Sequence, residues 1–317
     1  MGCKMIFSPQ AIAKTLGGAS LGGLLALDGC SPQGETKPGT GTGTGPSSGG
    51  GQPPAAGQLG LRRLGRTGLL LSSVGFGAQH TRDPDLIRYA MDRGINHIET
   101  AWAYGVGRPG NSCECIGKAI AGRRDSVCLA VAYSTEFSPT SRAWLPAQFE
   151  QALRDLGTDR IDVFLWHHPG GGSINNSQLT LQQSRALVAA GERLDLMLKW
   201  KQEGKIRWCG VTAHSEQVEW LQFVAESKQY DVAVLAFNYN SPPAVEKAME
   251  EASRAGIGLI AMKTQSPNYI EAQIGTAPDH RHALKWVLSK SYITAAIPGM
   301  TTRDQVDLNL NTMRSTV

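Results

Sequence analysis

The sequence lacks paired-cysteine motifs and a clear excess of charge of one sign. Its six cysteines show no CxxC spacing and no disulfide framework, which argues against a small disulfide-stapled fold. The 31 basic and 27 acidic residues leave a net charge of +4, and the basic residues are scattered rather than clustered. We therefore expect no nucleic-acid partner. What remains is an ordinary globular composition, 41% hydrophobic and 18% charged, which is enough for one large core.

Lysine is absent from one long stretch of the chain, between Lys118 and Lys199. Shortly before this stretch, residues 95–105 read INHIETAWAYG and place Glu99 five positions ahead of Tyr104. A tyrosine that donates a proton near neutral pH usually needs a cation beside it. The lack of lysine in this stretch therefore affects whether Tyr104 can donate a proton near neutral pH.

The first residues have the pattern of an export signal. Residues 15–27 form an uncharged apolar stretch that is too short to span a bilayer comfortably but suits a signal-peptide core. Residues 27–30, Leu-Asp-Gly-Cys, resemble a bacterial lipoprotein cleavage box, in which Asp28 fits poorly, and no Arg-Arg pair precedes the apolar stretch. We interpret residues 1–30 as a signal-like or lipoprotein-like segment. This predicts a periplasmic protein or one tethered to a membrane through a lipidated Cys30, and a cytoplasmic protein if the segment is not a working signal.

A segment of low complexity separates this signal from the rest of the chain. Residues 31–58 are mostly glycine, proline, serine and threonine, with almost no apolar content. Such a segment buries too little surface to offset the entropy of ordering, so we expect a flexible linker. The folded domain should then occupy residues 59–317.

Within this domain, short apolar runs alternate with segments of helical periodicity. Most runs are nearly continuous, as expected for parallel strands that are covered on both faces. About eight strands and eight helices in roughly 260 residues predict a (β/α)8 TIM barrel with an N-terminal hairpin. The alternative, an open doubly wound sheet, usually carries GxGxxG after its first strand, whereas residues 75–80 lack the third glycine. The expected strands are 73–76, 97–101, 127–132, 162–167, 206–212, 232–237, 258–262 and 295–298.

Helix boundaries can be read at two places. Asp83 before Pro84 predicts an N-cap and the first helical position. Gly256 is expected to end another helix as its C′ residue. Apolar side chains recur at spacings of three and four at Leu145, Phe149, Leu153 and Leu156, and again at Val245, Ala248, Met249 and Ala252.

Polar side chains follow several of the expected strands. Glu99, Tyr104, His167, Thr212 and Lys263 all fall at or just past a strand's carboxyl end. A barrel places its chemistry at that end, so we expect these groups to converge on one rim.

Two adjacent histidines end the strand DVFLWHHP at residues 162–169. Neighbouring side chains on a strand point to opposite faces, so only one of the two should face the barrel interior. We assign that position to His167 and expect His168 to be a packing or rim residue.

Six segments match, in order, the motifs of one known family. They are LRRLGRTGLLLSSVGFGA, INHIETAWAYG, LWHHP, KIRWCGVTAHS, GIGLIAMKT and IPGMTTRDQVDLN. Over residues 59–312 the chain thus resembles the aldo-keto reductase superfamily, in which these motifs belong to the N-terminal hairpin and to strands one, two, four, five, seven and eight. Several independent motifs in the right order make the resemblance stronger than any single match.

The resemblance implies an oxidoreductase that uses NADP or NAD to reduce a small-molecule carbonyl, an aldehyde or a ketone. Tyr104 would give the proton, and His167 would orient the carbonyl oxygen. Glu99 stands where the family has an aspartate paired with a lysine. The resemblance implies no metal, and we infer no protein partner.

The chain departs from the family at that lysine, which aligns with Ala132. A buried Glu99 without its cation should shift towards its protonated form. Tyr104 should lose its tuning, and the loss of a positioned acid typically costs about 10²–10⁴ in rate. Lys263 could reach inward as a replacement, although a lysine there would more often contact a cofactor phosphate.

The residues expected to hold the cofactor follow the family's pattern only in part. Gly299, Met300 and Gln305 occupy positions that often carry Lys, Ser and Arg, so NADPH and NADH both stay open, with NADP slightly preferred. Ala236 aligns with a glutamine that holds the nicotinamide amide. The expected cofactor-binding residues are Gly77, Ala78, Thr212, Lys263, Gly299, Met300, Thr301, Arg303, Gln305 and Asn309.

Three functions are compatible with this pattern. The first is a reductase with an altered or weakened proton-donor step. The second is a catalytically impaired barrel that binds a cofactor or another ligand at the cell envelope. The third is a barrel enzyme of different chemistry with Glu99 as a base.

Overall fold

The barrel is described by a computed structural model that covers residues 60–105, 110–134, 144–168, 180–265 and 280–314. All of these residues lie in one compact unit, Gly51–Val317. The expected signal-like segment at 1–30 and linker at 31–58 lie outside the described residues. Within the described part, no helix has both the length and the apolar character needed to cross a membrane.

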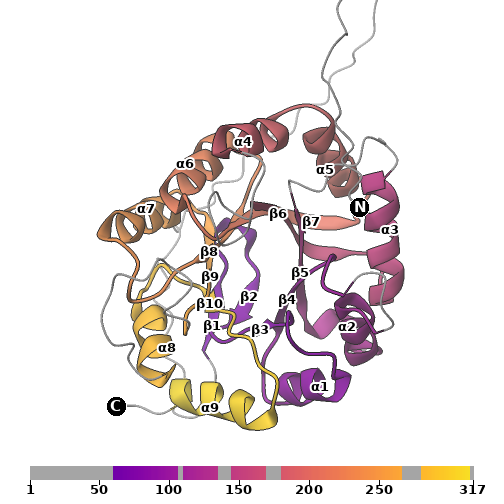
Figure 1. Cartoon of the computed structure of the whole chain (residues 1–317), viewed down its shortest axis with the longest axis vertical. Helices are drawn as coiled ribbons and strands as arrows, with labels where there is room; N and C mark the ends of the chain where they lie inside the picture. The colour runs from indigo at the N-terminus through magenta and orange to yellow at the C-terminus, as the bar shows by residue number, and fades with distance from the viewer. Residues whose placement is uncertain (1–59, 106–109, 135–143, 169–179, 266–279, 315–317) are drawn as a thin grey trace, which may run out of the picture. The chain divides into compact units, whose positions relative to one another are not determined.

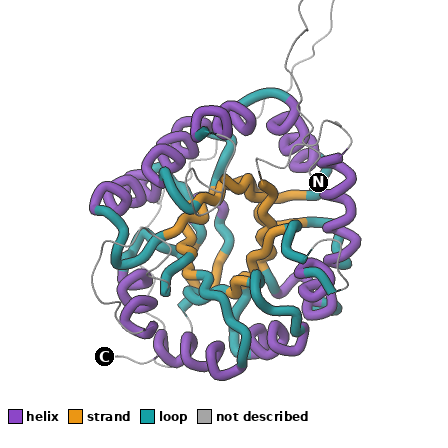
Figure 2. Tube along the Cα trace, in the orientation of Figure 1, coloured by secondary structure: helices purple, strands orange, loops and turns teal. Residues whose placement is uncertain are grey.

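Eight parallel strands form the centre of this unit and close into a ring. The strands are β3 (Phe76–Gly77), β4 (His97–Ala101), β5 (Cys128–Ser134), β6 (Ile161–His168), β7 (Ile206–Ala213), β8 (Val232–Ala236), β9 (Gly258–Met262) and β10 (Ala295–Ala296). Each strand pairs with the next from β3 to β10. Bridges between Val74 and Ala296 and between Gly77 and Gly299 join the two ends. Figures 1 and 2 show the strand ring inside a ring of helices, which confirms the predicted (β/α)8 barrel.

An antiparallel hairpin precedes the barrel, as predicted. It consists of β1 (Leu61–Arg63), a 3-10 turn η1 (Gly65–Thr67) and β2 (Leu70–Ser72). Leu64 and Leu71 are fully buried in the same cluster as the inward-facing strand residues, so the hairpin covers the amino-terminal end of the barrel. Gly65 has φ +47, and a Cβ there would lie 2.4 Å from the carbonyl oxygen of Gly256, which lies between α7 and β9. Only glycine allows this close approach.

The helices surround the strands, and their boundaries follow the sequence signals. They are α1 (Pro84–Asp92), α2 (Ser112–Ile120), a 3-10 turn η2 (Arg124–Ser126), α3 (Trp144–Leu156), α4 (Leu181–Ala189), α5 (Glu192–Gln202), α6 (Gln217–Ser227), α7 (Pro243–Arg254), α8 (His280–Ser289) and α9 (Arg303–Arg314). The Asp83 side chain accepts a hydrogen bond from the Asp85 amide at 2.9 Å and caps α1. Gly256 follows α7 with φ +86, as expected of a C′ glycine.

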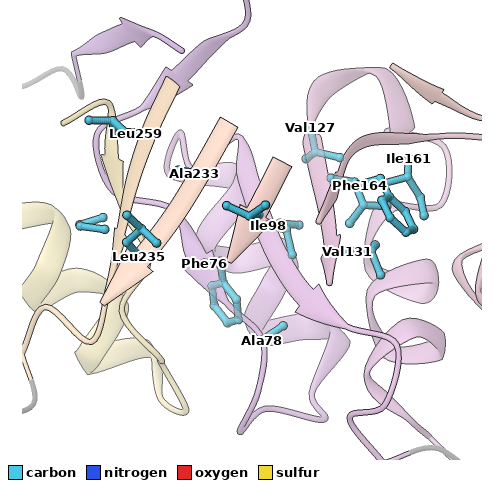
Figure 3. Packing of buried hydrophobic residues seen from close by; sticks show 14 of the residues in the cluster. Phe76, Ala78, Ile98, Val127, Val131, Ile161, Phe164, Ala233, Leu235 and Leu259 are labelled. Atoms are coloured by element: carbon cyan, nitrogen blue, oxygen red, sulfur yellow. The ribbon is translucent and has the colours of Figure 1, made fainter. Parts of the chain in front are cut away.

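Side-chain alternation divides the core into two layers. On β8, Val232, Val234 and Ala236 point into the barrel, whereas Ala233 and Leu235 pack towards the helices. Figure 3 shows members of this outer layer, including those two residues. The same period of two along the other strands decides which polar side chain faces the interior.

The observed strands differ from the predicted ones mainly near the seam of the ring. The run at 73–76 was expected to be one strand, but β3 is only Phe76–Gly77 and Val74 makes an isolated bridge. β10 is shorter than the expected 295–298. These segments contain glycine and proline, which weaken or interrupt a regular ladder.

Candidate active site

A cavity of about 760 Å³ opens at the carboxyl ends of the strands. This is the end at which barrels place their chemistry, and the volume lies within the range of about 300–1,000 Å³ typical of ligand sites. The three expected catalytic residues, Glu99, Tyr104 and His167, all line it. The structure therefore brings together side chains from two separate strands of the ring.

The segment after β4 positions Glu99 and Tyr104. Glu99 and Ala101 share the inward face of β4, since Ile98 packs in the outer layer. The Tyr104 amide donates to the Ala101 carbonyl at 3.0 Å, and the Ser112 amide donates to the Tyr104 carbonyl at 2.9 Å. The backbone of Tyr104 is thus held between the end of β4 and the start of α2.

Alternation on β6 separates the two histidines as predicted. His167 lines the cavity. His168 is fully buried on the other face, where its Nδ1 lies 2.9 Å from Ser184 Oγ and its Nε2 lies 2.8 Å from Glu216 Oε2. These contacts tie the end of β6 to α4 and to the segment before α6. His168 is therefore a packing residue that fixes the strand from which His167 projects.

A second imidazole stands beside His167. The His214 ring lies 5.1 Å from the His167 ring at an angle of 86°, and both line the cavity. Burial lowers the pKa of His167 to about 4 and that of His214 to about 2, with further lowering by neighbouring cationic groups. Both rings are therefore neutral near pH 7, and each can donate a hydrogen bond from one ring nitrogen.

Glu99 is a carboxyl group with an unusually high pKa. Burial raises its pKa from the usual 4.5 to about 7, and the nearby charge of Lys263 opposes this rise. The departure predicted from the sequence is thus present, because Ala132 lines the same cavity and contributes no charge. Near neutral pH, Glu99 exchanges between its protonated and ionised forms.

Lys263 projects from just past the end of β9 into the cavity wall. Its φ of +56 is unusual for a residue with a side chain. The Asn238 side-chain amide donates to the Lys263 carbonyl at 3.1 Å and holds the backbone there. Burial lowers the pKa of Lys263, and the charge of Glu99 opposes this lowering. The structure therefore couples Lys263 electrostatically to the carboxyl group of Glu99, which lines the same cavity.

Six of the ten expected cofactor-binding residues line the cavity. Several of them expose backbone or amide groups rather than charges, and Asn309 accepts a hydrogen bond from Gln265 at 2.8 Å. The six are Gly77, Thr212, Lys263, Gly299, Gln305 and Asn309.

The other four expected residues do not reach the cavity wall. Ala78 is 1% exposed, and its amide donates to the Glu99 carbonyl. Met300 is fully buried in the outer core layer. Thr301 donates from its amide and its hydroxyl to Gln305. The Arg303 guanidinium lies over the Tyr89 ring at 4.8 Å. Ala78 and Met300 are thus packed in the core, whereas Thr301 and Arg303 are exposed. A role of these four residues in cofactor binding stays a prediction.

Sequence reasoning missed several residues of the cavity. His214 is the clearest, because it lies two positions after Thr212 and a period of two puts both on one face. Thr264 was also missed, and its Oγ1 is buried without a partner among the described residues. The further missed residues at the wall include His80, Gln265 and His280. Among the described residues, no group of three or more acidic, histidine or cysteine side chains is arranged to hold a metal ion.

Comparisons with known proteins agree with the sequence motifs. The chain is 35% identical to aldo-keto reductase YhdN of Bacillus subtilis over 150 residues, which is 44% of this chain and 40% of that protein. It is 25% identical to pyridoxine 4-dehydrogenase of Escherichia coli over 266 residues, or 75% of this chain and 85% of that protein. The first curated relatives are matched over only 40% to 48% of their own length.

The fold has close counterparts among solved structures. An aldo-keto reductase from Klebsiella pneumoniae, solved in complex with NADPH, superposes with a TM-score of 0.62 and 20% identity, covering 82% of this chain and 91% of that one. This likeness concerns the fold. The model of the aldo/keto reductase family matches residues 76–266, more than half of the 317 residues, and the chain therefore belongs to the aldo/keto reductase family.

Proposed function

We propose that this chain is a nicotinamide-dependent oxidoreductase that reduces a small aldehyde or ketone. The observation that carries the proposal is the convergence of Glu99, Tyr104, His167 and Lys263 on one cavity at the carboxyl ends of the strands. A phenol and a neutral imidazole in one cavity can bind and protonate a carbonyl oxygen.

The cavity wall suits a dinucleotide. The Thr264 hydroxyl is buried at the wall without a partner among the described residues, as a hydrogen-bond donor awaiting a ligand would be. Amide groups of Gln265 and Asn309 lie at the same wall. The NADPH-bound relative from Klebsiella pneumoniae supports the same cofactor class.

The residues of the chain supply position and a proton. A reduced nicotinamide supplies the hydride when it is bound. Tyr104 delivers a proton to the carbonyl oxygen as the carbonyl carbon is reduced, and Tyr104 then regains a proton from water. His167 donates a hydrogen bond to the same oxygen. The products are an alcohol and the oxidised cofactor, so electrons and protons balance.

A two-step experiment tests the proposal. Purified protein is titrated with NADPH and with NADH by fluorescence, which also decides the preference between them. Oxidation of the tighter-binding cofactor is then followed at 340 nm with small aldehydes, ketones and quinones. We expect saturable binding and turnover with at least one carbonyl class. Binding without turnover would favour the alternative of a ligand-binding module, and the absence of binding would contradict the proposal.

A second chemistry follows from the pKa of Glu99. A half-buried carboxyl group with a pKa of about 7 is well matched to a general base at neutral pH. Base catalysis without a cofactor would exchange protons next to the carbonyl group of a ketone or an aldehyde. Incubation in deuterium oxide without nicotinamide separates the two functions, because only the base mechanism labels the substrate.

We also propose that the protein is exported and anchored through a lipid on Cys30. Support comes only from the sequence of residues 1–30. Metabolic labelling with a fatty acid tests it. Label in the membrane fraction that disappears in Cys30→Ser is the expected result, and an unlabelled soluble protein would contradict it.

A further inference from the structure

The cavity holds a cation that does not come from the strand the family uses. Ala132 on β5 contributes only a methyl group to the wall. Among the residues described at the wall, Lys263 is the single lysine, and no arginine joins it. The titratable side chains described there are His80, Glu99, Tyr104, His167, His214, Lys263 and His280.

Lys263 is held in place by its backbone. A left-handed conformation is unfavourable for a residue with a side chain and persists only where the surroundings enforce it. Here the Asn238 amide holds the Lys263 carbonyl, directly after Met262 at the end of β9. The turn aims the residue at the cavity that Glu99 lines, and such strained positions concentrate at functional sites.

We propose that Lys263, directly after β9, replaces the missing β5 lysine as the residue that positions and tunes the proton donor Tyr104. The inference rests on the proposed reductase function. Lys263 acts through Glu99 and Tyr104 rather than on the substrate, so it is a positioning residue. The site thus keeps its cation but receives it from the opposite side of the barrel ring, across the cavity from β5.

The charges at the wall agree with this assignment. Glu99 and Lys263 each oppose the effect of burial on the other, so each stabilises the charged form of its partner. His167 and His214 are neutral at pH 7 and cannot supply a positive charge. An ammonium group favours the ionised form of a nearby phenol and so makes it a stronger acid.

The competing role for Lys263 is a contact to a cofactor phosphate, and a set of variants separates the two. Lys263→Met removes the charge. Adding Ala132→Lys to it returns a lysine on the strand that lacks one, and adding Ala132→Met supplies the same bulk without charge. Lys228→Met is the matched control, because Lys228 also has a positive φ, of +57, but is exposed.

We expect Lys263→Met to lower kcat by at least about tenfold and to move the activity profile to higher pH, with cofactor affinity little changed. Ala132→Lys should restore most of the loss, Ala132→Met should not, and Lys228→Met should behave like the wild type. A rise in the cofactor Kd at unchanged kcat, or equal rescue by lysine and methionine, would overturn the proposal. Thermal unfolding of each variant shows whether it is folded.

If the wild type shows no turnover, that result contradicts the reductase function but not the electrostatic role of Lys263. A pH titration without cofactor then tests the role of Lys263. The tyrosinate absorbance that is lost in Tyr104→Phe identifies the titration of Tyr104. We expect Lys263→Met to move that titration to higher pH, and carbon-13 NMR to show a higher pKa for Glu99. No movement of either group would overturn the role of Lys263.

Discussion

The two ends of the barrel each hold a carboxyl group in the strand ring, and neighbouring charges compensate the two groups to different degrees. At the amino-terminal end, Asp162 is 3% exposed and meets Arg124 at 2.8 Å and Arg207 at 3.0 Å. It also accepts a hydrogen bond from the Leu129 amide at 2.9 Å. At the carboxyl-terminal end, Glu99 is half-buried and Lys263 is the main opposing charge. The pKa of Glu99 rises to about 7.

This difference separates stability from chemistry. Two guanidinium groups and a backbone amide satisfy Asp162. Its ion pairs join β6 to η2 and β7, and its hydrogen bond joins β6 to β5, at the end that the hairpin covers. Glu99 is left partly uncompensated, which costs stability but leaves a group that can exchange a proton near neutral pH. Barrels commonly divide these roles between their two ends in this way.

The largest effect is expected from Tyr104→Phe, which removes the proposed proton donor. Rates fall by about 10²–10⁴ when a positioned acid is lost, so kcat should drop by that factor with little change in unfolding temperature. Tyr133→Phe is the control, since the Tyr133 hydroxyl is buried without a partner among the described residues and lies in the outer layer. Equal activity of the two variants would remove Tyr104 from the mechanism.

At the other end, Asp162→Asn should destabilise the barrel without changing the chemistry. Removing one partner of a buried ion pair costs about 3–5 kcal/mol in the free energy of unfolding. Urea denaturation measures this loss, and cofactor affinity should stay constant below the transition. Asp159→Asn is the control, because the Asp159 side chain is 88% exposed in its pair with Arg160. A loss of about 1 kcal/mol or less in the free energy of unfolding of Asp162→Asn would mean that Asp162 does not stabilise the amino-terminal end of the barrel as described.

Glu99→Gln should change the free energy of unfolding in the opposite direction to Asp162→Asn, and the size of this change should depend on pH. The folded-state pKa of Glu99 is raised from 4.5 to about 7, so its stabilising contribution is present below pH 4.5 and is lost as the pH rises through 7. The variant should therefore gain stability relative to the wild type over that window, on the order of 3 kcal/mol at most. The perturbed histidines are common to both proteins and cancel in the difference. A constant difference from pH 4 to 8 would contradict the raised pKa.

Much of the fold could be read from the sequence because its local signals agree with the final packing. The strands at 97–101 and 258–262 were predicted with their observed bounds. As expected, Asp83 caps the start of α1 and Gly256 follows the end of α7. The bounds of the two short strands at the seam, β3 and β10, were not predicted correctly. These strands depend on closure of the ring rather than on a local run of apolar residues. The signal-like segment at 1–30 and the flexible linker at 31–58 stay predictions, because they lie outside the described residues.

The candidate site could be predicted where strand alternation decides the side of the sheet. Glu99 and His167 reach the cavity for this reason, together with Tyr104 just beyond β4. The positions of Met300 and Arg303 could not be predicted, because both depend on tertiary contacts. Met300 is buried in the outer core layer, and the Arg303 guanidinium lies over the Tyr89 ring. The same holds for the electrostatic interaction of Lys263 with Glu99, because these residues are far apart in sequence and line one cavity only in the folded barrel.

The most direct test of the account follows the hydride itself. The protein is given NADPH or NADH carrying deuterium at both C4 positions, together with an aldehyde that it turns over, and the alcohol is examined by mass spectrometry and NMR. The account predicts one deuterium on the former carbonyl carbon, formed much more slowly by Tyr104→Phe. An alcohol without deuterium on that carbon, or no alcohol with any carbonyl compound, would contradict it.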